Sequence, residues 1–436
     1  MAVAAADRAA VLTRIRARVE SALGAELAQR DRTRVRVDDQ AWIYELVARL
    51  VDEEQRRTAS AMNRDESALL LREVFAAVTP LGPLAEHLAD PDVEEIRING
   101  TEACFIFRGG RRYEIEPPFV DEGDLVDLVH WYTDGTSSAR LDRASPMVTM
   151  TLPEGSRLHA ALSPPARPMS LTIRRHPPSR FEDLESLAAS GFLPRELILL
   201  LEAAVAGRLN ILIAGGAGAG KTTFMRVLAR HIPADERVVT IEDQAELHLW
   251  RDLHDCISLE GRSPNTEGRG AITIQMLVHE ALRMSPDRII IGEVRGGEAL
   301  DLLDAMNTGH PGSICTIHAD SPRETLPRLV RVAMRNPHAP RPEAVLAEVV
   351  HTVDLVLYAG MVRVADSAGE SRGRRLLSVG CVQGVDDGRA AMQELVAYGH
   401  DGDWHRVGSP AAMPDRVRSK LASVCDPKRL LDAFDA

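Results

Sequence analysis

Short apolar runs alternate with helical stretches between residues 195 and 362. The runs are LNILIAGG, RVVTIED, DRIIIGEV and SICTIHA, each followed by glycine or by polar residues. Continuous apolar runs of this length are typical of strands that are buried on both faces, and strands that alternate with helices form parallel sheets covered by helices. The pattern therefore predicts an α/β domain over residues 195–362.

Two other patterns precede this domain. Residues 1–78 have helical periodicity, and in AWIYELVARLVDEEQRR one stripe contains Trp42, Ile43, Leu46, Val47, Leu50 and Val51. Residues 79–180 contain short β-type runs separated by turn signals such as Asn99-Gly100. We expect a helical N-terminal extension followed by a small α/β domain.

The remaining segments have weaker signals. A stretch of mixed polarity follows two prolines, and we expect residues 181–194 to be a linker. After residue 362 the chain becomes rich in glycine, aspartate and arginine, with weak strand patterns and a final helical stretch. Residues 363–436 are therefore predicted to be a C-terminal appendage.

The segment GGAGAGKTT follows the first apolar run and opens the helical stretch TTFMRVLARHI. It contains the pattern G-x-x-x-x-G-K-[ST]. Glycines let successive backbone N–H groups point at phosphate oxygens, the helix N-terminus adds the positive end of its dipole, and lysine adds a point charge. We predict a phosphate-binding loop made of Gly215, Gly216, Ala217, Gly218, Ala219, Gly220, Lys221, Thr222 and Thr223.

The use of lysine strengthens this prediction. Of the 52 lysines and arginines only three are lysines, and Lys221 is the one lysine in the first 419 residues. The compact ammonium group of lysine suits the β- and γ-phosphates of a nucleotide better than the planar fork of arginine does. A glycine-rich turn without chemical consequence is the alternative interpretation, and this placement of lysine argues against it.

Two further strands end in acidic residues. RVVTIED ends at Glu242 and Asp243, and DRIIIGEV presents Glu293, with Arg295 two residues further on. The carboxyl ends of parallel strands meet at one edge of a sheet, which is the edge that carries the predicted loop. Hydrolysis of a nucleotide needs one carboxylate near the metal and another that orients water. Either acidic residue alone could end a surface strand, but together with the loop they indicate a catalytic site.

Two histidines flank the next predicted strand. His318 ends SICTIHA at the same edge, where it could hydrogen-bond a phosphate or the carboxylates. His310 precedes the strand in MNTGHPGS. His318 is the stronger candidate, and a structural role for His310 stays open.

Charge and composition argue against other classes of protein. The formal net charge is −12 and aromatic residues make up 4% of the chain, so a basic groove with stacking residues, and hence nucleic acid as a partner, is not expected. No apolar run approaches the ~18 residues that span a membrane, and charged residues come too early for a signal peptide.

We expect a cytoplasmic ATPase. Its rivals are a RecA-like nucleic-acid translocase and a scaffold that binds nucleotide without hydrolysis.

Beyond these patterns, the sequence resembles the type II/type IV secretion ATPase superfamily over roughly residues 80–360. TIEDQAEL is similar to the acidic box of that superfamily, IIIGEVRG to its Walker B box and TGHPGSICTIHADSP to its histidine box. The stretch over residues 258–312 and PLGPLAEHLADPDVEEIRING resemble the tight-adherence (Tad/Flp) pilus assembly ATPases most closely.

This resemblance implies a fold and a function. It implies a RecA-like P-loop domain preceded by a small α/β domain that closes over the nucleotide. It further implies a homohexameric motor at the cytoplasmic face of the inner membrane, which docks on polytopic platform proteins. Such a motor uses ATP and Mg²⁺ to drive pilus assembly or secretion. A conjugation-type secretion ATPase is the alternative.

The resemblance also assigns roles to residues. Glu242 would polarise the attacking water, Glu293 would hold Mg²⁺ through water beside the hydroxyl of Thr222, and His318 would sense the nucleotide. Arg157 and Arg174, with Arg175 as an alternative, would reach the phosphates from the N-terminal domain. Arg262 and Arg269 would make contacts across subunits. Arg295 and His310 are candidates for further sensors. Walker B boxes usually offer an aspartate before the glutamate, whereas this chain has Gly292 there.

Overall fold

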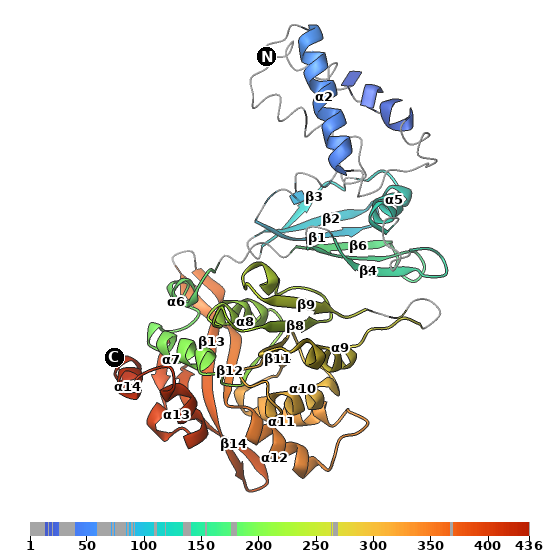
Figure 1. The fold of residues 1–436 in the computed structure, drawn as a ribbon. Coiled ribbons are helices and arrows are strands. Elements are labelled where there is room, and N and C mark those ends of the chain that lie inside the picture. The colour runs from blue at the N-terminus through green and yellow to red at the C-terminus, as the bar shows by residue number, and fades with distance from the viewer. Residues whose placement is uncertain are drawn as a thin grey trace. The chain divides into compact units, whose positions relative to one another are not determined.

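The protein forms two compact units in the computed structural model, Met1–Pro178 and Ser179–Ala436 (Figure 1). From residue 92 to 435 the structure describes the chain apart from 109–110, 118, 134–140, 153–154, 176–180, 263, 265–268 and 367–368. Before residue 92 it describes 14–15, 17–19, 21–25, 40–58, 71, 74, 84, 87–88 and 90. Within these residues, every helix is too short or too polar to cross a bilayer.

Helix α2 (Gln40–Thr58) carries the apolar stripe that the sequence predicts. The buried side chains of the stripe form one cluster with apolar side chains that precede and follow the helix, among them Val19 and Val74. The stripe itself contributes Ile43, Leu46, Val47, Leu50 and Val51, with Trp42 partly buried against them. Burial of one helix face thus holds this segment together, as its periodicity predicts.

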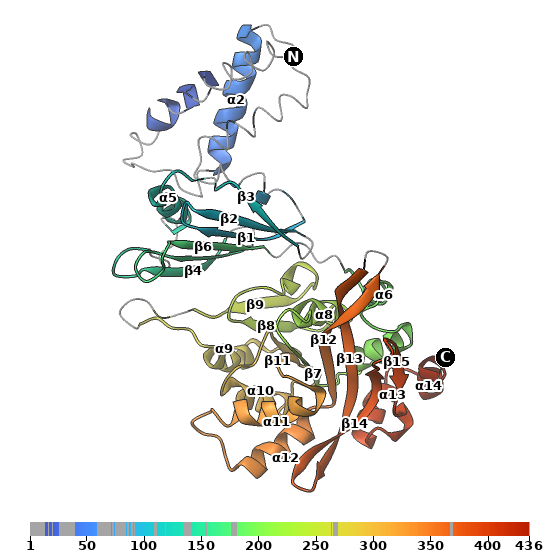
Figure 2. The same ribbon diagram turned by 180° about the vertical axis from the view of Figure 1, so that it is seen from behind.

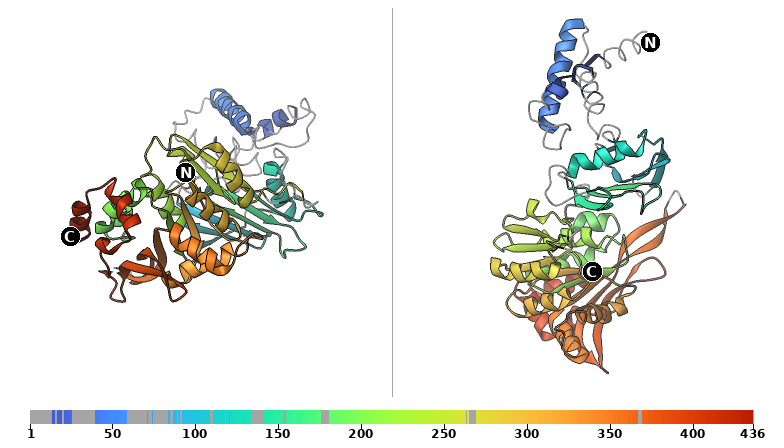
Figure 3. Two further views of the ribbon diagram at one scale, coloured as in Figure 1. Left: turned by 60° about the horizontal axis from the view of Figure 1, so that its bottom comes forward. Right: turned by 90° about the vertical axis from the view of Figure 1, so that its right-hand side faces the viewer.

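The rest of the N-terminal unit is a six-stranded antiparallel sheet. Its order is β3 (Arg111–Ile115), β2 (Ala103–Arg108), β1 (Val93–Asn99), β6 (Ser170–Arg174), β5 (Arg157–Ala161) and β4 (Met147–Thr151). Helix α5 (Glu122–Thr133) packs its buried residues, such as Leu125 and Trp131, into the same core as Ile96 and Leu171 of the sheet (Figure 3, right). The predicted small α/β domain is confirmed.

A nine-stranded sheet organises the C-terminal unit. Six strands run parallel in the order β12 (Leu355–Asp366), β7 (Ile211–Gly215), β11 (Ile314–His318), β10 (Arg288–Ile291), β8 (Val238–Glu242) and β9 (Cys256–Glu260). The four apolar runs of the sequence form β7, β8, β10 and β11, and all four are buried throughout except at the last residue of β11. The predicted parallel sheet is confirmed.

Helices cover both faces of this sheet (Figures 1 and 2). In β7, Ile211 and Ile213 join one core, while Leu212 and Ala214 join the other. The first core includes residues of α7 (Ile198–Ala206), α8 (Lys221–Ala229), α13 (Asp415–Ala422) and α14 (Pro427–Asp435). The second includes residues of α9 (Ile274–Ala281), α10 (Glu298–Asn307), α11 (Pro322–Ala333) and α12 (Pro342–Thr352).

The predicted appendage, residues 363–436, continues the same sheet. β13 (Gly369–Asp386) pairs antiparallel with β12, β14 (Arg389–Tyr398) pairs with β13, and β15 (Trp404–Arg406) closes the row. Helix α13 is tied to the start of β12, because Lys420 Nζ lies 2.6 Å from Oδ2 of the buried Asp354. The C-terminal segment therefore belongs to the compact unit of the P-loop.

The predicted linker, residues 181–194, also lies inside this unit. It contains α6 (Leu184–Ala189), which Asp183 caps by accepting a hydrogen bond from the Ser186 N–H. Phe192 and Leu193 are buried in the first core. Four short 3₁₀ helices complete the described secondary structure of the unit: Arg195–Leu197, Leu249–Arg251, Leu282–Met284 and Pro410–Ala412.

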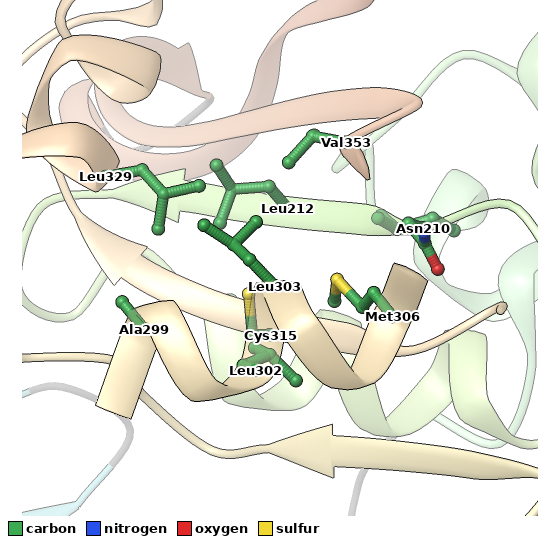
Figure 4. A pocket seen from close by; sticks show the side chains of 10 residues that line it. Asn210, Leu212, Ala299, Leu302, Leu303, Met306, Cys315, Leu329 and Val353 are labelled. Atoms are coloured by element: carbon green, nitrogen blue, oxygen red, sulfur yellow. The ribbon is translucent and has the colours of Figure 1, made fainter. Parts of the chain in front are cut away.

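The face covered by α10 and α11 is closely packed. A cavity of about 10 Å³ remains between these helices and strands β7 and β11. Figure 4 shows its lining, which is apolar apart from Asn210. A water molecule alone needs roughly this volume, so this cavity has no room for a larger ligand.

A buried ion pair holds the amino ends of the parallel strands together. Arg288 opens β10, is fully buried, and binds both carboxylate oxygens of Glu236. The Nη1 group of Arg288 also donates to the carbonyl of Val205 at 2.6 Å. Glu236 has a second, more exposed partner in Arg208, whose Nε lies 3.2 Å from its Oε1, so loss of Arg288 leaves the buried carboxylate only partly compensated.

We predict that Arg288→Met lowers the free energy of unfolding by about 3–5 kcal/mol, because Glu236 then loses its buried partner. Urea unfolding of the full chain, followed by circular dichroism, measures this loss. Arg283→Met is the matched control, since the Arg283 side chain is 70% exposed. A loss no larger than that of the control would show that the pair does not stabilise the sheet.

Candidate nucleotide-binding site

The loop between β7 and α8 has a backbone that requires glycine. Gly215, Gly218 and Gly220 have φ angles of 149°, 72° and 91°. A Cβ atom at Gly215 would lie 2.1 Å from the carbonyl oxygen of Ala359 on the neighbouring strand. Side chains at these positions would be strained or excluded, so the glycines set the path of the loop.

Lys221 folds its side chain back into this loop. Its Nζ donates to the carbonyls of Gly215 and Gly216, each at 2.9 Å, and the residue is only 8% exposed. Burial lowers the pKa of Lys221, which the negative charge of Glu293 partly offsets. Thr222 and Thr223 follow it in the first turn of α8, both half-buried.

Glu242 ends β8 and is 3% exposed. Its Oε1 accepts hydrogen bonds from the backbone N–H groups of Glu246 and Leu247, both at 3.1 Å. Burial raises the pKa of Glu242 to about 8, although these two N–H groups favour the ionised form. The carboxyl group is therefore mainly protonated at neutral pH.

Glu293 follows β10 and joins a chain of charged groups. Its Oε2 accepts a hydrogen bond from Arg295 at 2.6 Å, and its Oε1 lies 3.2 Å from Nε2 of His318. Arg295 also reaches Oδ2 of Asp243 at 3.2 Å. Burial, together with the positive charge of Lys221, lowers the pKa of His318. The imidazole is thus neutral at physiological pH.

The register of the sheet explains why these groups meet. His318 pairs with Gly215 across β11 and β7, and Ile291 pairs with Ile241 across β10 and β8. The residues that end these strands therefore share one edge with the loop, as the sequence predicts.

The contact between Glu242 and Gly292 explains why this chain has glycine where Walker B boxes usually have aspartate. A Cβ atom at Gly292 would lie 2.9 Å from Cγ of Glu242. The Glu242 side chain fills the space that an aspartate would need. Gly292 is therefore a packing requirement of this site.

The other residues with predicted roles lie in different places. Arg157 and Arg174 face each other across β5 and β6 of the N-terminal unit. Arg262 and Arg269 are exposed near an isolated bridge after β9, where Arg262 donates to the carbonyl of Gly270 at 2.8 Å. His310 precedes the amino end of β11, with Nδ1 3.2 Å from the Ala305 carbonyl, so it is not brought to the loop.

One residue beside the loop was not expected from the sequence. Arg374 of β13 donates a hydrogen bond from Nε to the carbonyl of Gly218 at 2.9 Å. Its strand lies in the weakly patterned C-terminal segment, where one arginine among many gives no signal. Only pairing of β13 with β12 places it here.

Comparison with known proteins agrees with this site. The family model described as "Type II/IV secretion system protein" matches residues 79–407, which include both the six-stranded sheet and the loop. The chain belongs to this family. Its C-terminal unit is the RecA-like domain of a secretion ATPase, and the family implies binding and hydrolysis of nucleotide.

Several relatives have names that describe their machines. A putative conjugal transfer protein of Mycobacterium tuberculosis is 36% identical over 59% of this chain and 74% of that protein. VirB11 of Agrobacterium fabrum is 34% identical over 57% of this chain and 78% of its own length. The type IV secretion system protein PtlH of Bordetella pertussis is 36% identical over 59% of this chain and 83% of its length.

Two solved structures are also similar to this chain. The VirB11 ATPase of the Brucella suis type IV secretion system is 30% identical, with 67% of this chain and 95% of that chain covered and a TM-score of 0.35. The pilus retraction motor PilT with ADP is 17% identical, with 69% and 83% covered and a TM-score of 0.49.

These names refine the resemblance that the sequence suggested. The superfamily is confirmed. The three relatives with similar sequences that are described above are conjugal transfer and type IV secretion proteins. Their names favour the conjugation-type alternative over the prediction of a Tad/Flp pilus ATPase.

The raised pKa of Glu242 predicts a dependence of stability on pH. The folded protein holds a proton on Glu242 up to pH about 8, whereas the unfolded chain releases it near 4.5. Relative to a neutral side chain, Glu242 therefore costs stability increasingly as pH rises between these values, and the cost is constant above them. We expect the melting temperature of Glu242→Gln, minus that of the wild type, to grow from pH 5 to pH 8.5.

Thermal unfolding in a series of buffers measures this difference. Glu343→Gln, at an exposed position in the first turn of α12, is the control and should show little change with pH. A difference for Glu242→Gln that stays flat with pH would mean that burial does not raise this pKa.

Proposed function

We propose that this protein hydrolyses ATP to drive a type II/IV secretion machine, and that the cluster at the carboxyl edge of the sheet is its active site. The observation that carries the proposal is that Lys221, Glu293 and His318 meet at the loop, with Glu242 on the adjoining strand. A surface turn would not gather these groups. Membership of the secretion family supports the same activity.

The residues of the loop suit the phosphates of ATP. The loop lies at the N-terminus of α8, where backbone N–H groups attract anions. Lys221, held beside the loop carbonyls, supplies a positive charge that can turn to the β- and γ-phosphates. The glycine conformations leave the loop without side chains at 215, 218 and 220 that would block a ligand.

Hydroxyl and carboxylate oxygens in this cluster fit Mg²⁺. The hydroxyl of Thr222 and the carboxylate of Glu293 are oxygen donors of the kind that Mg²⁺ prefers, with Glu293 acting through water. When bound, the ion neutralises charge on the phosphates. Arg295 donates to the Glu293 carboxylate at 2.6 Å, which orients the carboxylate for this role.

Glu242 is the residue that we propose to orient the attacking water. An ionised carboxylate is a stronger acceptor for water than a protonated carboxyl group and can act as a general base, and the two N–H groups of Glu246 and Leu247 hold its Oε1 in a fixed position. His318 is proposed to sense the nucleotide, because it lies 3.2 Å from Glu293 and beside Gly215. Arg295 links the same carboxylate to Asp243, so it is a further sensor.

Arginines outside the loop complete the proposed site. Arg157 and Arg174 sit directly opposite each other in the ladder, where like charges repel, so an anion such as a phosphate would stabilise the pair. We assign them to the phosphates, and Arg262 and Arg269 to contacts between subunits. His310 has no proposed role at the nucleotide, since it lies at the amino end of β11.

For the machine itself, we propose a homohexamer that works at the cytoplasmic face of the inner membrane, against polytopic platform proteins. The conjugal transfer and type IV secretion relatives favour a conjugation-type machine. Nucleic acid is not a proposed direct partner, because the chain has a net charge of −12. Tad/Flp pilus assembly is the second candidate, supported by the resemblance of the stretch over residues 258–312.

We predict Mg²⁺-dependent ATP turnover that rises steeply with protein concentration, because arginines of one subunit complete the site of another. Turnover per protomer should be measured over a range of protein concentrations at pH 8.5, where Glu242 is ionised. Lys221→Ala and Glu242→Gln should both lose turnover. Glu343→Gln should behave as the wild type.

Two results would contradict parts of this proposal. Turnover that does not depend on protein concentration would mean that each chain has a complete site, and the intersubunit roles of Arg262 and Arg269 would be abandoned. Absence of turnover, with nucleotide still bound, would favour the scaffold that binds without hydrolysis.

The kind of machine is tested in the organism of origin. Deletion of the gene should abolish DNA transfer or protein secretion and leave surface filaments unchanged, because the relatives belong to transfer systems. Restoring wild type should recover the process, whereas restoring Lys221→Ala should not. Loss of surface filaments with transfer intact would instead support pilus assembly.

A further inference from the structure

Arg374 lies against the phosphate-binding loop from the side opposite to the catalytic residues. The sheet places β11 on one side of β7 and β12, followed by β13, on the other. His318 of β11 pairs with Gly215, and Ala359 of β12 pairs with the same residue. Arg374 of β13 is opposite Met361, two positions beyond Ala359. The strand order thus brings a second cation to the loop.

The contacts of Arg374 are specific to the loop. Its Nε donates to the carbonyl of Gly218 at 2.9 Å. Its Cδ lies 3.3 Å from the position that a Cβ atom would take at Gly220, the residue that caps α8. A larger side chain at position 220 would press on this arginine as well as strain the backbone.

Two cations therefore bind carbonyl oxygens of the loop. Lys221 binds those of Gly215 and Gly216 from within, and Arg374 binds that of Gly218 from the flank. A guanidinium has five N–H donors in a planar fork, and the bond to Gly218 uses one of them. The remaining donors suit phosphate oxygens, to which arginine often binds through two hydrogen bonds.

The side from which Arg374 arrives indicates which phosphates it meets. Lys221 interacts electrostatically with Glu293 and His318, which contact each other. Because these three residues are the ones that we assign to the terminal phosphate and its metal ion, we place that phosphate on the β11 side of the loop. The opposite side of the loop is then left for the part of the nucleotide nearer the nucleoside. ATP and ADP share that part.

We propose that Arg374 is a further nucleotide-binding residue, which contacts the diphosphate part shared by ATP and ADP. This inference rests on the proposed function of the loop. It differs from a sensing role, because a residue that contacts the γ-phosphate would distinguish ATP from ADP.

The test is equilibrium binding of fluorescent ADP and of a fluorescent, slowly hydrolysed ATP analogue to the full chain. Arg374→Ala should weaken binding of both by the same factor, roughly 10- to 100-fold, since one or more charged hydrogen bonds are lost. Arg389→Ala, at an exposed arginine that begins β14, is the matched control and should bind as the wild type.

Two further variants separate a phosphate contact from support of the loop. Arg374→Gln can still donate to the Gly218 carbonyl but has no charge, whereas Arg374→Lys keeps the charge. A phosphate contact predicts weak binding for Gln, partial recovery for Lys, and an unchanged melting temperature without nucleotide in all three variants.

Each other outcome is informative. Wild-type affinity in Arg374→Gln, or a lower melting temperature of the nucleotide-free variants, would reduce Arg374 to a support of the loop and overturn the inference. A loss confined to the ATP analogue would move its contact to the γ-phosphate. If Lys221→Ala loses binding while Arg374→Ala does not, the inference fails and the proposed function stands. A wild-type protein that binds neither nucleotide would overturn both.

Discussion

The backbone pairing of β7 with β11 and β12 is the constraint on which the site depends. Because β7 is hydrogen-bonded on both sides, the loop that leaves it starts between two fixed backbones. On one side Gly215 pairs with His318, and on the other it approaches Ala359 so closely that any Cβ would collide with the carbonyl. The path of the loop is therefore set by the sheet before any ligand binds, which reduces the ordering that binding requires.

The same register creates a conflict at Glu242. Its position at the end of β8, next to the edge strand β9, buries the carboxyl group, which opposes ionisation, yet a general base that activates water must be ionised. The N–H groups of Glu246 and Leu247 reduce this conflict without removing it. A group poised in this way can change its protonation near neutral pH, which suits general-base chemistry. Stability at this position is given up for function.

Arginine and lysine divide the tasks around the loop. Lys221 is compact enough to fold inside it, whereas Arg374 and Arg295 act from its two flanks through longer, planar groups. Arg295 binds two carboxylates and so organises acidic groups, while Arg374 binds a backbone carbonyl. Almost all the basic residues of this chain are arginines, and the one buried lysine lies where a planar guanidinium group does not fit.

The sequence by itself determined the parts of this protein that depend on local pattern. Apolar runs identified β7, β8, β10 and β11, glycine spacing identified the loop, and parallel order placed Glu242, Glu293 and His318 at its edge. Only the tertiary structure decided that residues 363–436 extend the sheet, that Gly292 makes room for Glu242 and that Arg374 reaches Gly218. These features depend on contacts between residues up to 156 positions apart, and such contacts leave no periodicity in the chain.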